Sequence, residues 1–161
     1  LELSRQGRFR IGTKIAVLGL GGGSAETAVL ESTADGVWIR ALGGIEGVGG
    51  ENFDDLLFRK VVAHKLKAID PQVSSRVWDP PDVDWLRARE DLFREVRRAK
   101  EELSEAQNTE LNTGALINVP LSLSRIELES VLRSEILRAT RNWARRWNWP
   151  GCGPGSWTGC C

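Results

Sequence analysis

The first fifty residues contain apolar runs of strand length, each closed by glycine or by a polar turn. The runs cover residues 14–18, 27–30 and 37–42, and the triplet 34–36 separates the last two. Short apolar runs that include β-branched residues and lie between turn signals are typical of strands. The pattern predicts a meander in which strand, glycine turn, strand, turn and strand follow one another.

Beyond residue 50 the apolar positions recur at helical spacing. Asn52 is the expected N-cap of a first helix, with acidic residues in the first turn, and this helix is expected to continue to about Lys67. Residues 70–81 are polar and marked by prolines, so a connection is expected there.

A second helix is expected from Trp85 to about Ala106, with Asp84 as its cap. The remaining positions of this helix mix basic with acidic side chains, which is typical of a solvated surface carrying pairs four residues apart. Its expected apolar face comprises Leu86, Phe93, Val96, Ala99 and Leu103.

The last third of the chain predicts two short strands and one helix. The strands are expected at 109–111 and 116–119, with a turn at 112–114 between them. Ser124 and Glu127 then fit the S-x-x-E capping box, which predicts a helix from there through Ala139.

Composition limits the class of protein. The 161 residues are about one domain's worth, and 41% of them are hydrophobic, enough for a core. With 22 basic and 22 acidic side chains the formal charge is zero, so neither nucleic acid nor a membrane is an expected partner. No apolar run approaches the length of a membrane span, and a cytoplasmic location is expected.

The cysteines and the single histidine support no metal or nucleophile chemistry. All three cysteines, Cys152, Cys160 and Cys161, lie at the end of the chain without a C-x-x-C pair, and His64 stands far away in sequence. Zinc sites and Cys–His nucleophiles need these residues in close groups. No metal ligand is therefore identified.

Candidate chemistry lies in the run 19–24, Gly-Leu-Gly-Gly-Gly-Ser, which follows the first predicted strand. Consecutive glycines let backbone N–H groups wrap an anion, so the run predicts a phosphate cradle. It falls one residue short of the dinucleotide fingerprint G-x-G-x-x-G, which must open a helix. A strand pattern follows instead, although a purely structural hairpin turn remains an alternative.

Four segments in order, 14–30, 49–54, 98–104 and 123–129, make the chain similar to a known family. They resemble, at similar spacing, the ATPase domain of the seventy-kilodalton heat-shock chaperones, the DnaK family. The resemblance covers roughly residues 10–140. It implies an α/β fold, namely part of an actin-like (ribonuclease H-like) ATPase lobe in which a β-meander precedes helices and a small stranded subdomain.

The resemblance also implies site residues and ligands. ATP or ADP with Mg²⁺ would bind, and hydrolysis in the family needs carboxylates that organise the ion and its water. Unfolded client proteins and co-chaperones are the partners that it implies, in ATP-dependent protein folding and the stress response. Gly21, Gly22, Gly23, Ser24 and Gly50 match the phosphate-binding positions, and Lys100 and Ser104 match positions that line the adenosine pocket.

Several positions depart from the family pattern. Gly19 stands where the family has an aspartate, and Glu26 is the remaining acidic candidate, with Ala25 in place of an aromatic neighbour. Arg97 replaces a glutamate of the adenosine pocket and could contact a phosphate or the ribose, while Glu101 stands where arginine or an apolar residue is common. Nucleotide recognition is expected to be partly kept and catalysis to be lost.

The chain is expected to be a fragment. It contains no Met, and it lacks the family's first lobe, adenine loop and peptide-binding domain. We expect residues 1–141 to form part of lobe II, and the Trp- and Cys-rich residues 142–161 to be unstructured or to result from a frameshift near residues 140–143. Two alternatives stay open, a degenerate lobe that acts as an interaction module and another ATPase of the actin and sugar-kinase superfamily.

Overall fold

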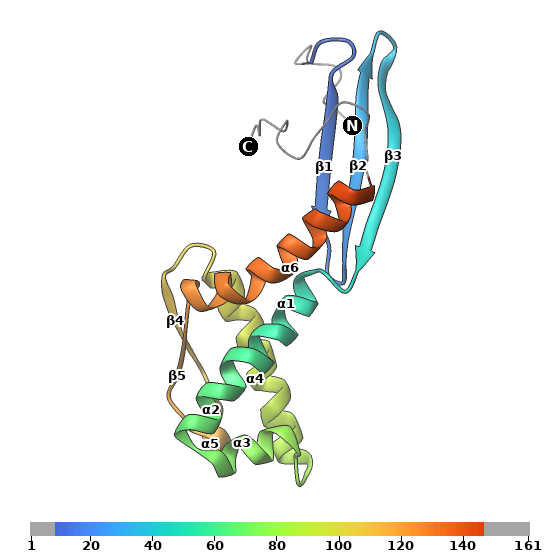
Figure 1. Ribbon diagram of the computed structural model, residues 1–161. Helices are drawn as coiled ribbons and strands as arrows, with labels where there is room; N and C mark the ends of the chain where they lie inside the picture. The colour runs from blue at the N-terminus through green and yellow to red at the C-terminus, as the bar shows by residue number, and fades with distance from the viewer. Residues whose placement is uncertain (1–8, 147–161) are drawn as a thin grey trace. The chain divides into compact units, whose positions relative to one another are not determined.

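The computed structural model of the chain describes residues 9–146 (Figure 1). The described residues divide into two units, one made of residues 9–50 and 136–146 and the other of residues 51–135. The fold is α/β, as predicted. Its elements are β1 (Lys14–Leu20), β2 (Ser24–Thr33), β3 (Gly36–Glu46), α1 (Gly50–Leu57), the π-helical η2 (Phe58–Val62), α2 (Ala63–Ile69), α3 (Pro71–Trp78), α4 (Val83–Glu102), β4 (Asn108–Leu111), α5 (Gly114–Ile117), β5 (Leu121–Ser124) and α6 (Arg125–Arg146).

The first unit contains the predicted meander. β1, β2 and β3 form an antiparallel sheet in that order, seen in blue to cyan in Figure 1. Ala28 pairs with Val17 on one side and with Leu42 on the other, which fixes the register. Because β2 follows the glycine run directly, the helix that a dinucleotide fingerprint requires is absent at this position, and that interpretation is wrong.

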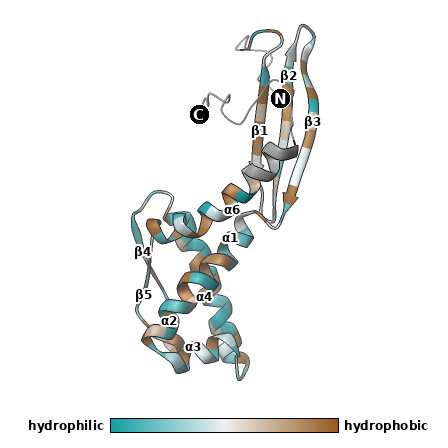
Figure 2. Ribbon diagram, viewed as in Figure 1, coloured by the Kyte–Doolittle hydropathy of each residue, from teal (hydrophilic) through white to brown (hydrophobic). Residues whose placement is uncertain are grey.

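Burial in the sheet is concentrated on the central strand. Ala25, Thr27 and Val29 alternate as buried residues along β2, as expected for one face of a strand. Leu30 is buried as well, because the register against β3 shifts between Val29 and Leu30 and breaks the alternation. Figure 2 shows further hydrophobic segments along the strands. The exposed ones include Val17, Leu18, Leu20, Trp38, Ile39 and Leu42.

The two glycine-rich loops of the first unit pack backbone against backbone. A Cβ atom at Gly49 would lie 2.4 Å from the carbonyl oxygen of Gly22 and 2.7 Å from that of Gly21. Real Cβ atoms do not approach backbone this closely, so only glycine fits here. The amide of Gly50 donates to Gly21 O at 2.9 Å, and the amide of Gly47 donates to Gly23 O at 2.9 Å.

The first helix begins earlier than predicted. α1 starts at Gly50, so Asn52 lies inside its first turn and is not the N-cap. The reason is tertiary, since the Gly21 carbonyl accepts from the Gly50 amide and satisfies a donor at the start of the helix. The helical run then continues through η2 and α2 to Ile69, two residues past the predicted end.

The proline-marked segment is a helix, and the prediction of a connection over 70–81 is wrong. The Asp70 carboxylate accepts from the amides of Gln72 and Val73 at 2.9 and 3.0 Å, and Pro71 occupies the first helical position of α3. Proline is favoured there because its missing N–H would have no helical partner. Only residues 79–82 connect α3 to α4.

α4 is capped by Asp82, not by the predicted Asp84. The Asp82 carboxylate accepts from the amides of Asp84 and Trp85, both at 3.0 Å. Leu86 of the predicted apolar face is 39% exposed, because it lies one residue off the buried stripe. That stripe comprises Trp85, Leu92, Val96, Ala99 and Leu103.

The charged surface predicted for α4 is confirmed. Arg98 forms ion pairs with Glu95 at 3.1 Å and Glu102 at 2.5 Å. Other pairs three or four residues apart join Arg87 to Asp84, Arg94 to Asp91 and Arg97 to Glu101.

The small stranded part contains β4 and β5, which pair antiparallel with Thr109 opposite Leu123. β4 matches the strand predicted at 109–111. The strand predicted at 116–119 is wrong, since this stretch holds α5, whose end is set by Asn118 in the left-handed conformation at φ 44°. The hydroxyl of Thr113 closes the loop, accepting from the amide of Val119 at 3.2 Å and donating to its carbonyl at 2.9 Å.

The predicted capping box is present at the start of α6. The Ser124 hydroxyl accepts from the amide of Glu127 at 3.3 Å, and the Glu127 carboxylate accepts from the amide of Ser124 at 2.9 Å. Lys65 of α2 forms an ion pair with the same carboxylate at 2.8 Å. Burial opposes ionisation of Glu127, but the hydrogen bonds from Lys65 and Ser124 outweigh it and lower the pKa of this carboxyl.

α6 continues to Arg146, past the boundary expected after residue 141. Residues 147–161, with all three cysteines, lie outside the described residues, so the tail hypothesis stays a prediction. None of the helices in the described part of the chain combines the length and the apolar character needed to cross a membrane.

The second unit has its own hydrophobic core. Residues from all its helices and both its strands contribute, and each fully buried large side chain adds roughly 1.5–3 kcal/mol. The core comprises Leu57, Phe58, Val62, Leu66, Val77, Trp85, Leu92, Val96, Ala99, Leu103, Leu111, Ile117, Val119, Leu121, Leu123 and Leu128.

Replacing Glu127 with glutamine should lower the free energy of unfolding by about 1–2 kcal/mol at neutral pH, because the ion pair with Lys65 is lost while an acceptor for the cap remains. The pKa of Glu127 is lowered in the folded state, so its contribution is present above the unfolded pKa and is lost as the pH falls through the folded one. Urea unfolding at a series of pH values measures this. Glu129→Gln, at an exposed position of the same helix, is the control. A deficit that persists unchanged at low pH would contradict the assignment.

Replacing Gly49 with alanine should destabilise the first unit by about 1–3 kcal/mol, since the two glycine loops must separate to admit the methyl group. Gly23→Ala is the matched control, because a Cβ atom there meets nothing within 4 Å and the change should cost less than about 0.5 kcal/mol. Equal stability of the two variants in urea would show that the loops are not in contact.

Candidate functional site

The glycine run forms a tight exposed loop between β1 and β2. The amide of Gly21 donates to the carbonyl of Ser24 at 2.8 Å and closes the turn. Within the described residues, no acceptor in the chain engages the amides of Gly22 and Gly23, and both residues are exposed. Successive backbone N–H groups without a Cβ in the way are the arrangement that binds phosphate oxygens. Both amides are therefore available to an external acceptor.

The second glycine loop, which contains Gly49 and Gly50, packs against the backbone of the first. Gly50, predicted to bind phosphate, uses its amide to hold the Gly21 carbonyl at 2.9 Å. Its neighbour Gly49, which the sequence marked only as a close-approach position, makes the tightest backbone contact with the loop. The structure thus assigns Gly49 and Gly50 to bracing the loop, in addition to any part in ligand contact.

Gly19 and Glu26 face one another across β1 and β2 as a cross-strand pair. A Cβ atom at Gly19 would meet only the Glu26 carbonyl oxygen, at 3.9 Å, which is ordinary van der Waals contact. The space at position 19 would therefore admit the first side-chain carbon of the aspartate that the family has there. Over residues 9–146, no group of three or more His, Cys, Asp or Glu side chains is placed to hold a metal ion. The acidic donors here do not by themselves make a Mg²⁺ site.

The predicted adenosine residues belong to the second unit, at the end of α4. Arg97 and Lys100 lie three residues apart on α4, whereas Ser104 lies in the turn after the helix, which ends at Glu102 and not at the predicted Ala106. Arg97 pairs with Glu101 at 3.6 Å, and the Ser104 hydroxyl donates to the Glu101 carbonyl at 2.6 Å. Lys100 is the most enclosed of the three, with its side chain 16% exposed.

Lys100 has a buried partner that the sequence did not reveal. The Asp54 carboxylate, 3% exposed, lies 2.6 Å from the Lys100 ammonium. A buried carboxylate needs such a partner, because an uncompensated charge in the interior is costly. No local signal could have identified the pair, since the two residues are far apart in sequence. Asn52, also in α1, carries a buried side-chain oxygen with no hydrogen-bond partner within the described part of the chain.

The end of α4 is fixed to the strand β4 and to α6. Arg98 donates to the Glu110 carbonyl at 2.9 Å, and Arg125 donates to the Leu103 carbonyl at 2.8 Å. The hydrogen bond from Thr109, followed by that from Arg98, lowers the pKa of Glu102, and the hydrogen bond to Glu95 is the largest of the effects that raise the pKa of Arg98. This network holds the last turn of α4, which carries Lys100, and the turn after the helix, which contains Ser104.

Comparison with known proteins shows the family of the chain. The chain is similar to the chaperone protein HscA homologs of Shewanella oneidensis (35% identical over 96 residues), Shewanella putrefaciens (33% over 96 residues) and Burkholderia thailandensis (36% over 97 residues). Each match covers 60% of this chain but only 13–14% of the relative. The family model described as Hsp70 protein matches residues 7–146. The chain therefore belongs to the Hsp70 family.

Proposed function

We propose that this chain binds the phosphates of ATP or ADP at the loop Gly21–Ser24, as part of the nucleotide-binding domain of an ATP-dependent chaperone. The observation that carries the proposal is the exposed loop whose Gly22 and Gly23 amides have no acceptor in the chain. The bracing by Gly49 supports it further, because a preformed loop loses less conformational freedom when the anion binds.

In the second unit, we propose that Lys100 and Ser104 contact the adenosine, with Arg97 at a phosphate or the ribose. The buried Asp54 carboxylate supports this role for Lys100, because it restricts the position of a long flexible side chain. Unfolded clients, co-chaperones, the stress response and a cytoplasmic location belong to the same proposal and rest on the family alone.

Hydrolysis is the part of the function that this sequence supports least. Hydrolysis of this kind depends on Mg²⁺ that bridges phosphate oxygens and on groups that position the attacking water. With glycine at position 19, two acidic residues stay close to the loop in the sheet register, Glu26 opposite Gly19 and Glu46 opposite Ser24. We therefore propose nucleotide binding with little or no hydrolysis. Gly19 equally favours the second candidate, a non-catalytic lobe that serves as an interaction module.

Titration of the ¹⁵N-labelled chain with Mg-ATP should shift the amide resonances of Gly22 and Gly23, with a dissociation constant in the millimolar range. Gly36 is the internal control, because it lies at the turn between β2 and β3, at the opposite end of β2 from the loop. Adenosine alone should leave the loop resonances unchanged, since it carries no phosphate. Unshifted Gly22 and Gly23 resonances would refute phosphate binding here, and micromolar affinity would refute the expectation of weak binding.

Replacing Gly19 with aspartate should preserve the fold and raise the Mg²⁺-dependent part of the ATP affinity by about tenfold, the effect of roughly 1.4 kcal/mol. The carboxylate adds a negative charge beside the phosphate loop, where Mg²⁺ would bind. Gly19→Asn is the matched control, having the same shape without the charge. Calorimetric titration with and without Mg²⁺ measures the difference. If Mg²⁺ changes the ATP affinity of the two variants equally, the result contradicts a damaged ATPase and favours the interaction module.

A further inference from the structure

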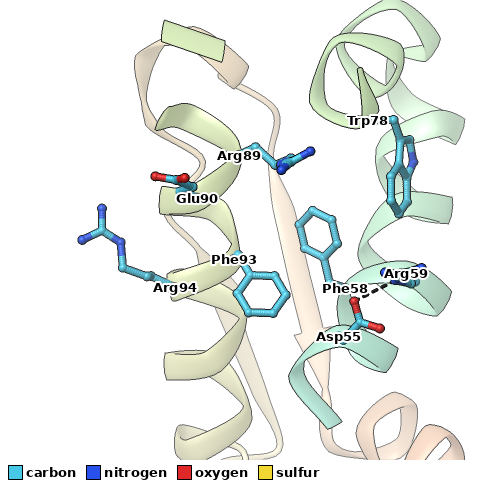
Figure 3. Close-up of a pocket in the computed structure, with 8 residues that line it drawn as sticks. All are labelled: Asp55, Phe58, Arg59, Trp78, Arg89, Glu90, Phe93 and Arg94. Carbon is cyan, nitrogen blue, oxygen red and sulfur yellow. Dashed lines mark hydrogen bonds and ion pairs between the residues drawn. The ribbon is translucent and has the colours of Figure 1, made fainter. Parts of the chain in front are cut away.

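A second concave site lies within the helical unit, separate from every residue proposed to contact the nucleotide. It is a pocket of about 480 Å³ between the α1–η2 segment, α3 and α4 (Figure 3). Ligand sites for small molecules fall in the range of roughly 300–1,000 Å³. Arg97, Lys100 and Ser104 do not line it, so the proposed nucleotide contacts leave this pocket unexplained.

Three aromatic rings form the apolar wall of the pocket. The ring of Phe58 meets Trp78 edge to face, with centroids 5.7 Å apart, and lies tilted against Phe93 at 5.5 Å. Phe58 is buried, whereas Trp78 is 45% exposed. A large exposed indole beside two other rings offers unused aromatic surface, which favours a planar aromatic ligand over an aliphatic one.

The charges around the pocket leave one cation without a counterion. Arg59 pairs with Asp55 at 2.7 Å, and Arg94 pairs with Asp91. Arg89 has no ion-pair or hydrogen-bond partner among the described residues. Figure 3 shows its guanidinium reaching from α4 toward Phe58 and Trp78, whereas Glu90 and Arg94 point away.

We propose that this pocket binds a small planar aromatic monoanion, with its ring against Phe58, Phe93 and Trp78 and its carboxylate on Arg89. Guanidinium groups bind carboxylates through parallel N–H donors, and they also stack on aromatic faces. The two features therefore converge on one ligand class. They also differ from the chemistry of the glycine loop, which offers backbone amides and no aromatic ring.

An acidic residue at the pocket limits the charge of the ligand. Asp55 lines the pocket, so a ligand with several negative charges would meet this carboxylate as well as the guanidinium of Arg89. Like charges brought together in a partly enclosed site oppose binding. A polyphosphate or a phosphorylated peptide is thus disfavoured, and a single carboxylate on an aromatic ring fits the balance of charges.

The test is calorimetric titration of the full chain with 2-naphthoate, and with the neutral 2-naphthamide as its ligand-side control. Arg89→Met keeps the aliphatic stem and removes the charge, and we expect it to weaken 2-naphthoate binding by about tenfold or more. Arg87→Met is the matched control, since Arg87 lies on the same helix, is 72% exposed and pairs with Asp84 outside the pocket. It should leave the affinity unchanged.

Three further readouts separate the site from a general effect on folding. Arg89→Lys retains the charge and should keep most of the affinity, even if Arg89→Met proves less stable. Trp78→Leu should weaken both 2-naphthoate and 2-naphthamide, because both ligands present the same rings. ATP should not compete with 2-naphthoate.

The proposal is overturned if 2-naphthoate does not bind at millimolar concentration or if 2-naphthamide binds as tightly as 2-naphthoate. It is overturned equally if Arg89→Met binds 2-naphthoate as the unmodified chain does. Competition by ATP would also refute it, because the ligand would then occupy the nucleotide site.

Discussion

The first unit depends on one contact, the packing of the Gly49 backbone against the Gly21–Gly22 backbone. No side chain could occupy this space, since an added Cβ atom would lie 2.4 Å from a carbonyl oxygen. The contact positions the Gly50 amide on Gly21 and thereby the first residue of α1. The loop stays exposed all the same. Its carbonyl groups at Gly21 and Gly22 contact the second glycine loop, while the amides of Gly22 and Gly23 have no acceptor among the described residues.

The helical unit is organised around polar groups that have partners, not around its apolar core alone. Asp54 and Lys100 form a largely buried ion pair, and Glu127 combines a helix cap with an ion pair to Lys65. Removing one partner of such a buried pair leaves a costly charge behind. Each pair joins two helices at one defined turn, Asp54 of α1 to Lys100 of α4 and Lys65 of α2 to Glu127 of α6.

The two candidate sites use opposite chemistry. The proposed phosphate site in the glycine loop would use backbone amides alone and needs no charged side chain. The ligand proposed for the pocket beside Phe58 and Trp78 would use aromatic surface and one guanidinium. Membership of the Hsp70 family supports the first proposal. The second follows from the local arrangement of α1, η2, α3 and α4.

The sequence by itself determined the elements that depend on neighbouring residues, namely the meander, the charged face of α4, β4 and the capping box at Ser124. Alternation, helical spacing and local caps need no distant partner. Only the tertiary structure decided the start of α1, which a carbonyl from the Gly21 loop sets, the pairing of Asp54 with Lys100, and the pocket at Arg89. The helix at Pro71 did carry a local signal, an aspartate cap before proline, that the polar composition obscured. The rest joins residues distant in sequence, and no local pattern encodes which of them meet.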